Sequence, residues 1–117
     1  MNYFNGEKVS GDCINHINYW GDVEKKNGFE STWSIFGDEL AADSNHGLGP
    51  NAKVRYCGFW DDKVSIVSVD GDTILDLWAA ADKALNDVQE GQHRFIEAFS
   101  VNERSGEDNV WDLMTGS

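Results

Sequence analysis

The stretch "SVDGDTILDLWAAADKAL" (residues 68–85) decides the fold, because a β-rich run gives way in it to an amphipathic helix. The apolar residues of this stretch, continued to residue 88, fall within one narrow sector of a 3.6-residue wheel. They are Ile74, Leu77, Trp78, Ala81, Leu85 and Val88. The opposite side carries Asp76, Lys83, Asp87 and Glu90. The pattern predicts a helix that buries one side against a sheet and exposes the other.

The turn of residues 70–72 before this helix carries two aspartates around a glycine, and it has three interpretations: a metal loop, an anion site or a helix cap. Thr73 and Asp76 have the spacing of a capping box, in which hydroxyl and carboxylate satisfy amides of the first turn. A calcium loop needs oxygen ligands where this run has Ile74 and Leu77. The carboxylates also repel any phosphate from the helix N-terminus. We therefore interpret the turn as a cap.

Strand patterns lie upstream of the helix. The runs "KVRYCGFW" (residues 53–60) and "VSIVSV" (residues 64–69) are rich in strand formers, and the short polar "DDK" joins them. This arrangement predicts an antiparallel hairpin. Farther upstream, "FESTWSIF" (residues 29–36) is rich in strand formers. Most of its apolar residues fall on one side of an alternating pattern and most of its polar residues on the other, which predicts another strand.

The segment "GDCINHINYWGDVEKKNG" (residues 11–28) predicts a first helix. Val9, Cys13, Ile17 and Trp20 lie at helical spacing, and we expect them to form its apolar side. We expect the N-cap at Ser10 or Asp12 and the end of the helix at Gly28.

Downstream, "HRFIEAFSV" (residues 93–101) predicts a strand, and the tail "NVWDLMTGS" (residues 109–117) predicts a short edge strand. The predicted fold class is therefore α+β, with an antiparallel sheet of about four to five strands and two helices packed mainly on one face. The length of 117 residues predicts a single domain, residues 1–117.

Glu97 conflicts with its surroundings, because strand alternation places it on the same side as Phe95 and Phe99. A buried Glu97 would act as an acid or base, or would pair with an arginine. The simpler interpretation places Phe95, Glu97 and Phe99 on the outer side of the sheet, since unpaired carboxylates are almost never fully buried. That side then needs a cover, which a chain terminus, a second subunit or a partner protein would provide.

The cysteines and histidines do not predict a metal site. Cys13 and His16 have ligand spacing, and His46, Cys57 and His93 lie elsewhere, but a second closely spaced pair is lacking. Two distant cysteines are also too few for a disulfide framework. The amino terminus has no basic run followed by an apolar stretch, and no apolar run approaches the roughly 18 residues of a membrane span. We expect a cytoplasmic protein without a cofactor.

The charge favours a protein partner. The chain has 21 acidic and 9 basic residues, a formal net charge of -12. Such a chain repels nucleic acid and anionic lipid and attracts basic proteins. We therefore expect a non-enzymatic binding protein of inhibitor or immunity type, which occludes a basic nucleic-acid-binding surface. The residues predicted to bind the partner are Asp61, Asp62, Asp76, Asp87 and Glu90. A charge that only keeps the protein soluble is an equal alternative.

Two other functions stay open. One is a small-molecule-binding domain or small enzyme, with a pocket between sheet and helices around Glu97. The residues predicted for this pocket or for the open sheet face are Tyr56, Trp60, His93, Phe95, Glu97 and Phe99. The other is a homodimeric structural protein that uses both sides of its sheet. No familiar catalytic sequence motif is present, which favours binding over catalysis.

Overall fold

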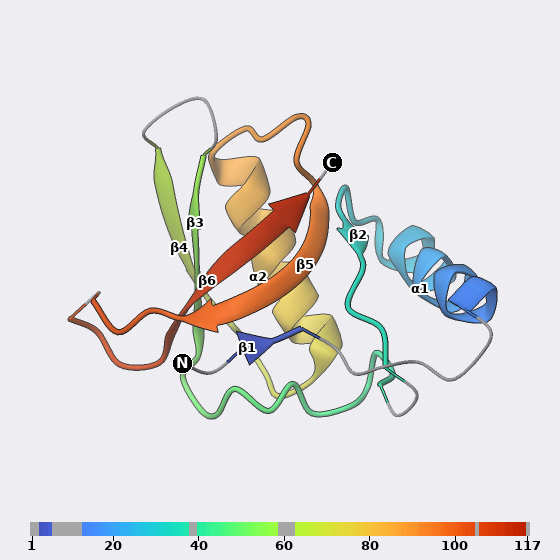
Figure 1. The fold of residues 1–117 in the computed structure, drawn as a ribbon, viewed down its shortest axis with the longest axis horizontal. Coiled ribbons are helices and arrows are strands. Elements are labelled where there is room, and N and C mark those ends of the chain that lie inside the picture. Colours follow the sequence, from blue (N-terminus) through green and yellow to red (C-terminus); the bar gives the residue numbers. More distant parts are fainter. Residues whose placement is uncertain (1–2, 6–12, 38–39, 59–62, 105, 117) are drawn as a thin grey trace.

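The computed structural model describes residues 3–5, 13–37, 40–58, 63–104 and 106–116. These residues form two helices and a sheet, and the fold belongs to the α+β class, as predicted (Figure 1). The elements, in chain order, are β1 (Tyr3–Phe4), α1 (Cys13–Asn27), β2 (Thr32–Trp33), β3 (Lys53–Cys57), β4 (Val64–Ser68), α2 (Ile74–Asp87), β5 (Phe95–Val101) and β6 (Val110–Gly116). No helix within the described ranges is long and apolar enough to cross a membrane.

The sheet is mixed, so the prediction of a purely antiparallel sheet is wrong. Its strands follow the order β1-β5-β6-β3-β4, and β2 also pairs with β5. The pairs β3·β6 and β2·β5 are parallel, and the other three pairs are antiparallel. The tail strand β6 therefore lies inside the sheet between β5 and β3, and its prediction as an edge strand is wrong. Val110, Trp111 and Leu113 of this strand are buried, which explains its interior position.

The hairpin of β3 and β4 is confirmed. Lys53 pairs with Ser68, Arg55 with Ile66 and Cys57 with Val64, in antiparallel register. Backbone hydrogen bonds from Gly58 N to Lys63 O and from Val69 N to Ala52 O, both 2.8 Å, extend the ladder at its two ends. The connection that carries Trp60, Asp61 and Asp62 lies outside the described residues.

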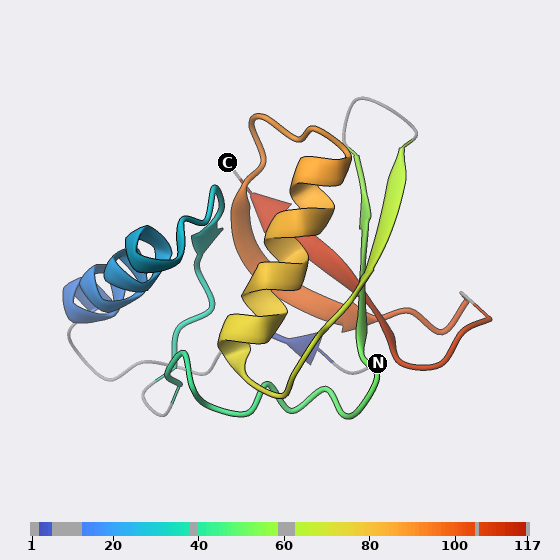
Figure 2. The same cartoon turned by 180° about the vertical axis from the view of Figure 1, so that it is seen from behind.

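Helix α2 lies across one face of the sheet, against β3 and β4 (Figure 2). All six residues of its predicted apolar sector are buried: Ile74, Leu77, Trp78, Ala81, Leu85 and Val88. This prediction is confirmed. The packing of α2 provides most of the cover for this face, and the buried side chains form one hydrophobic core.

Helix α1 lies beside β2 at the edge of the sheet, so of the two described helices only α2 spans the sheet face (Figure 2). It contributes Trp20 to the core, where the Trp20 ring lies 5.7 Å from Trp33 and 6.2 Å from Trp78. Ile17 was predicted on its apolar side but is 54% exposed, because α1 contacts the body of the protein along a narrow strip. The helix ends before Gly28, as predicted, and Gly28 adopts φ of 69°.

A bulge in β5 changes which residues face the core. The pairing with β6 runs from Ile96 opposite Thr115 directly to Ala98 opposite Met114, which leaves Glu97 as the extra residue. The alternation shifts there, and Phe99 points into the core, fully buried. The prediction that Phe99 lies on the outer side is therefore wrong. Phe95 and Glu97 are exposed, as the simpler interpretation predicted.

Candidate binding surface

Two chain segments meet at the N-terminal end of α2. Backbone hydrogen bonds run from His46 N to Asp72 O (2.8 Å), from Ile74 N to Ser44 O (2.8 Å) and from Leu75 N to Ala42 O (2.9 Å). These bonds hold residues 42–46 alongside residues 72–75. The acidic residues of both segments are thereby brought to one end of the molecule.

The buried His46 stabilises the contact between residues 42–46 and residues 72–75. Its side chain is buried, its Nδ1 accepts a hydrogen bond from Leu48 N at 3.0 Å, and its Nε2 lies 3.1 Å from Gly71 O. Because Nδ1 accepts, the ring proton is on Nε2 and is donated to the Gly71 carbonyl. His46 therefore orders the turn of residues 70–72 and has both ring nitrogens occupied.

The predicted capping box at the start of α2 is confirmed. Asp76 N donates to Thr73 Oγ1 at 3.2 Å, and Thr73 N donates to Asp76 Oδ2 at 3.1 Å. Thr73 Oγ1 also lies 2.8 Å from Asp76 Oδ2. Gly71 has φ of 134°, and a Cβ there would lie 2.1 Å from Asp76 Oδ2. The Asp76 carboxylate is thus part of the cap and needs a glycine at position 71.

Two of the carboxylates predicted to bind a partner have structural contacts of their own. Asp76 belongs to the capping box. Asp87 Oδ2 accepts a hydrogen bond from Ser65 at 2.9 Å and lies 3.6 Å from Lys83 Nζ, which ties the end of α2 to β4. Their loss would weaken the fold as well as any interaction, so they are poor choices for testing a partner site.

Glu90 is buried, so its predicted place on the acidic surface is wrong. Its exposed fraction is 6%, its Oε1 accepts a hydrogen bond from Tyr56 at 3.0 Å, and its Oε2 accepts from the backbone amides of Gln92 (3.2 Å) and His93 (3.1 Å). The helical wheel fails here because α2 ends at Asp87, and Gln89 adopts φ of 57°, which turns the chain inward.

Three of the carboxylates that the fold does not use lie at this end of the molecule, and we call Asp43, Asp70 and Asp72 the acidic end. All three are exposed. Within the described part of the chain, their side chains form no hydrogen bond or ion pair. No lysine or arginine occurs between Lys26 and Lys53 or between Lys63 and Lys83, so both segments contribute negative charge alone. Asp43 was not among the residues predicted from the sequence, although this gap in positive charge was a usable signal.

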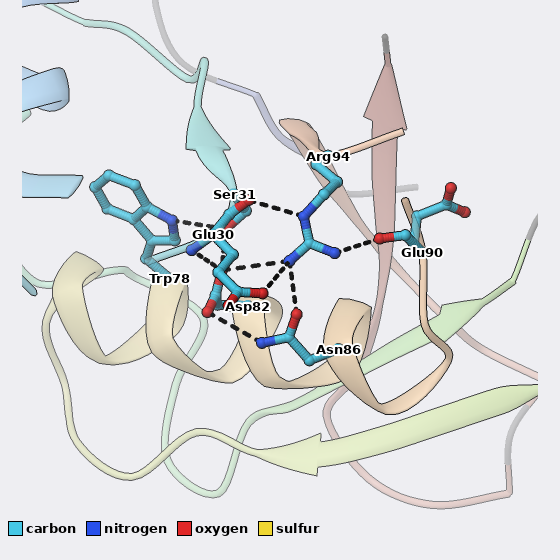
Figure 3. A network of polar contacts seen from close by, with 7 residues as sticks. All are labelled: Glu30, Ser31, Trp78, Asp82, Asn86, Glu90 and Arg94. Carbon is cyan, nitrogen blue, oxygen red and sulfur yellow. Dashed lines mark hydrogen bonds and ion pairs between the residues drawn. The ribbon is translucent and has the colours of Figure 1, made fainter. Parts of the chain in front are cut away.

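A partly buried polar network lies beside α2, on its side toward β2 and the loop before β5 (Figure 3). Trp78 Nε1 donates to Ser31 Oγ at 3.0 Å, and Ser31 Oγ donates to Asp82 Oδ1 at 2.7 Å. Arg94 donates to the carbonyl oxygens of Glu30 (2.8 Å) and Glu90 and to Asn86 Oδ1 (2.7 Å), and its Nη2 lies 3.9 Å from Asp82 Oδ1. The network joins the segment before β2, helix α2 and the loop before β5. Sequence patterns gave no indication of it.

The outer face of the sheet is open among the described elements. Val64, Ile66, Phe95 and Met114 on this face have exposed fractions between 43% and 47%. Arg55 Nη1 lies 3.0 Å from Asp112 Oδ1, which Asn102 Nδ2 also approaches at 3.1 Å. A shallow hollow of about 570 Å³ opens beside this pair. It is lined by Arg55, Ser100, Val101, Asn102, Glu103, Arg104 and Asp112.

The residues predicted for a pocket do not come together. Tyr56 and Phe99 are buried on the core side, whereas Phe95 and Glu97 are exposed on the outer face. His93 is half-buried in the loop before β5, and Trp60 lies outside the described residues. Glu97 does not line the hollow beside Arg55. Burial raises the pKa of the Tyr56 phenol, and the hydrogen bond to Glu90 acts in the same direction.

The histidines and cysteines are dispersed. His46 is buried near α2, Cys57 is an exposed free thiol, and the His16 ring stacks on Phe36 at 5.9 Å. Among the residues for which positions are given, no three His, Cys, Asp or Glu side chains are placed to hold a metal ion.

Comparisons with models of known protein families, with curated proteins and with solved structures found no match.

Proposed function

We propose that this protein binds a basic partner protein through its acidic end and occludes a nucleic-acid-binding surface of that partner. The observation that supports this function is the group of three exposed carboxylates, Asp43, Asp70 and Asp72, which the fold brings to one end and does not itself use. We propose the cytoplasm as its location, and the exposed free thiol of Cys57 is compatible with a reducing compartment.

Some carboxylates of this protein stabilise the fold, and others form no hydrogen bond or ion pair with other described residues. Asp82 and Glu90 accept hydrogen bonds in the interior, and Asp76 caps α2. The carboxylates of the acidic end form no ion pair within the described residues, so they are available to the lysines or arginines of a partner. The net charge of -12 would also steer a basic partner toward the protein and speed association at low salt.

The test is affinity capture from a lysate of the source cells on the immobilised protein, with elution in a salt gradient and identification of each retained protein. The test variant is Asp43→Asn/Asp70→Asn/Asp72→Asn. The control variant is Asp22→Asn/Glu103→Gln/Asp108→Asn, which removes the same three negative charges from exposed positions elsewhere.

We expect the wild type and the control variant to retain the same discrete basic protein and the test variant to release it at low salt. The purified partner should then lose nucleic-acid binding when the wild-type protein is added. Equal retention by all three columns would contradict a role for the acidic end. Equal loss from both variants would mean that only total charge matters.

A further inference from the structure

Among the described strands, β4 has an open edge. It pairs with β3 on one side, and no second described strand pairs with it. The bonds from Gly58 N to Lys63 O and from Val69 N to Ala52 O place the odd-numbered residues 63–69 in hydrogen bonds with β3. By the alternation of an antiparallel ladder, the backbone amides and carbonyls of Val64, Ile66 and Ser68 point away from β3, toward the open edge.

This edge lacks the usual protection against strand addition. Protein edges are commonly blocked by lysine, proline or a bulge. The run from Val64 to Val69 contains no charge and no proline, and its pairing with β3 is regular. Val64 and Ile66 are each 47% exposed on the outer face. The edge therefore offers both backbone hydrogen bonds and apolar contacts to an extended chain.

A hollow of about 280 Å³ lies between this edge and α2. It is lined by Val67, Ser68, Asp70, Asp76, Ala79, Ala80 and Lys83. Val67, Ala79 and Ala80 provide an apolar wall. The polar lining includes the carboxylates of Asp70 and Asp76. Lys83 lies 3.6 Å from Asp87, a carboxylate that is not part of the lining. The hollow thus offers an apolar wall to the stem of a long side chain and the Asp70 carboxylate to its cationic end, and the Lys83 ammonium in the lining reduces that attraction.

We propose that the partner contributes an extended basic segment that adds to β4 as a further strand. The segment bonds to the backbone of Val64, Ile66 and Ser68 and places one arginine or lysine in the hollow, with its charged end at Asp70. This inference rests on the proposed function, because it names the part of the basic partner that is bound and connects the sheet edge with the acidic end.

The geometry supports one such side chain. Neighbouring strands lie about 4.8 Å apart, and side chains alternate between the two faces. Val67 faces the core side of β4, as does its partner Val54 on β3, so residues of an added strand on that same side would lie over the hollow. A second copy of this chain is the less favourable occupant, since two copies at -12 repel each other.

The test uses a defined probe, a ten-residue peptide of alternating threonine and valine with a central arginine. One control peptide carries citrulline in place of arginine, which keeps the shape and removes the charge. Two further peptides are N-methylated at alternate residues, in one frame or the other, so that only one of them blocks hydrogen bonds to β4. Binding is followed by NMR shifts and hydrogen exchange of the protein's amides.

We expect the arginine peptide to slow exchange of the Val64, Ile66 and Ser68 amides, and only one methylated frame to abolish this effect. Replacing the peptide's arginine by citrulline should weaken binding about tenfold or more, and so should Asp70→Asn in the protein. Each change removes a charge-assisted hydrogen bond. Asp72→Asn removes the same charge from a residue that does not line the hollow, and it should weaken binding by less than about threefold.

Other outcomes would overturn the inference. If the peptide binds without affecting the three β4 amides, the edge is not the site. If Asp70→Asn and Asp72→Asn weaken binding equally, the hollow does not hold the cation. If sedimentation finds a dimer of the wild type that Ile66→Lys dissociates, the edge binds a second copy. The proposed function is tested separately, by capture of a basic protein through the acidic end. If that capture succeeds, any of these three results contradicts the strand-addition inference and not the proposed function.

Discussion

The hydroxyl of Ser31 donates a hydrogen bond of 2.7 Å to the carboxylate of Asp82, and the two residues are 51 positions apart in the sequence. This bond is buried and joins the segment before β2 to the middle of α2. Ser31 also accepts from Trp78 Nε1 at 3.0 Å, so one hydroxyl satisfies two buried groups (Figure 3).

Ser31→Ala should therefore destabilise the protein by about 1–3 kcal/mol, because it leaves the Trp78 indole and the Asp82 carboxylate each short of a buried partner. Ser34→Ala is the matched control, since the Ser34 side chain forms no hydrogen bond within the described residues, and it should stay within about 0.5 kcal/mol of wild type. Urea unfolding followed by tryptophan fluorescence measures both. Equal effects of the two substitutions would argue against the network.

Gly71→Ala should lower stability more than Thr73→Ala. Removing the N-cap hydroxyl is expected to lose about 1 kcal/mol. An alanine at position 71 adds backbone strain at φ of 134°, about 1–3 kcal/mol, and its Cβ displaces the Asp76 carboxylate from the cap. Gly91→Ala is the control, since its Cβ would meet nothing within 4 Å. Thermal unfolding ranks the three, and a Gly71→Ala protein as stable as the control would refute this arrangement of the cap.

Alkaline pH should destabilise the protein through Tyr56. Burial raises the pKa of this phenol above its ordinary value of 10.0, so above pH 10 the unfolded chain loses a proton that the folded protein retains. Stability from this group is complete below pH 10 and decreases as pH rises toward the folded-state pKa. Tyr56→Phe should remove this part of the pH dependence.

Absorbance of tyrosinate measures the Tyr56 effect directly, since the chain has three tyrosines. The tyrosinate component with the raised pKa should be absent from Tyr56→Phe and present in Tyr19→Phe. A late component that survives in Tyr56→Phe would assign it to another tyrosine.

Neutralising two sets of three carboxylates should have opposite effects on stability. Asp43→Asn/Asp70→Asn/Asp72→Asn should be as stable as wild type or more so, because it removes repulsion and no described hydrogen bond. Asp76→Asn/Asp87→Asn/Glu90→Gln should be less stable than wild type, with the largest loss, about 1–3 kcal/mol, from the buried Glu90. Denaturant midpoints at one pH compare the two. Similar losses in both would mean that the acidic end also holds the fold.

Many features of the site and of the fold could not be predicted from the sequence, because these features depend on contacts between distant segments. The acidic end needs Asp43 beside the start of α2, and backbone bonds between residues 42–46 and 72–75 produce that contact. The helical wheel placed Glu90 on the polar side of the predicted helix. In the structure α2 ends at Asp87, before Glu90, and the chain turns inward so that Glu90 binds Tyr56. Neither fact has a periodic signal in the sequence.

The sequence by itself determined the elements whose stability is local. The 3.6-residue pattern of Ile74 to Val88 and the Thr73/Asp76 pair defined α2, and two β-rich runs with a short connection defined the hairpin. Only the tertiary structure decided that β6 lies between β5 and β3, that the bulge at Glu97 turns Phe99 inward, and that β4 has an open edge among the described strands. The reason is physical: helix periodicity and capping act over a few residues, whereas strand order and register depend on which distant surfaces bury the most apolar area together.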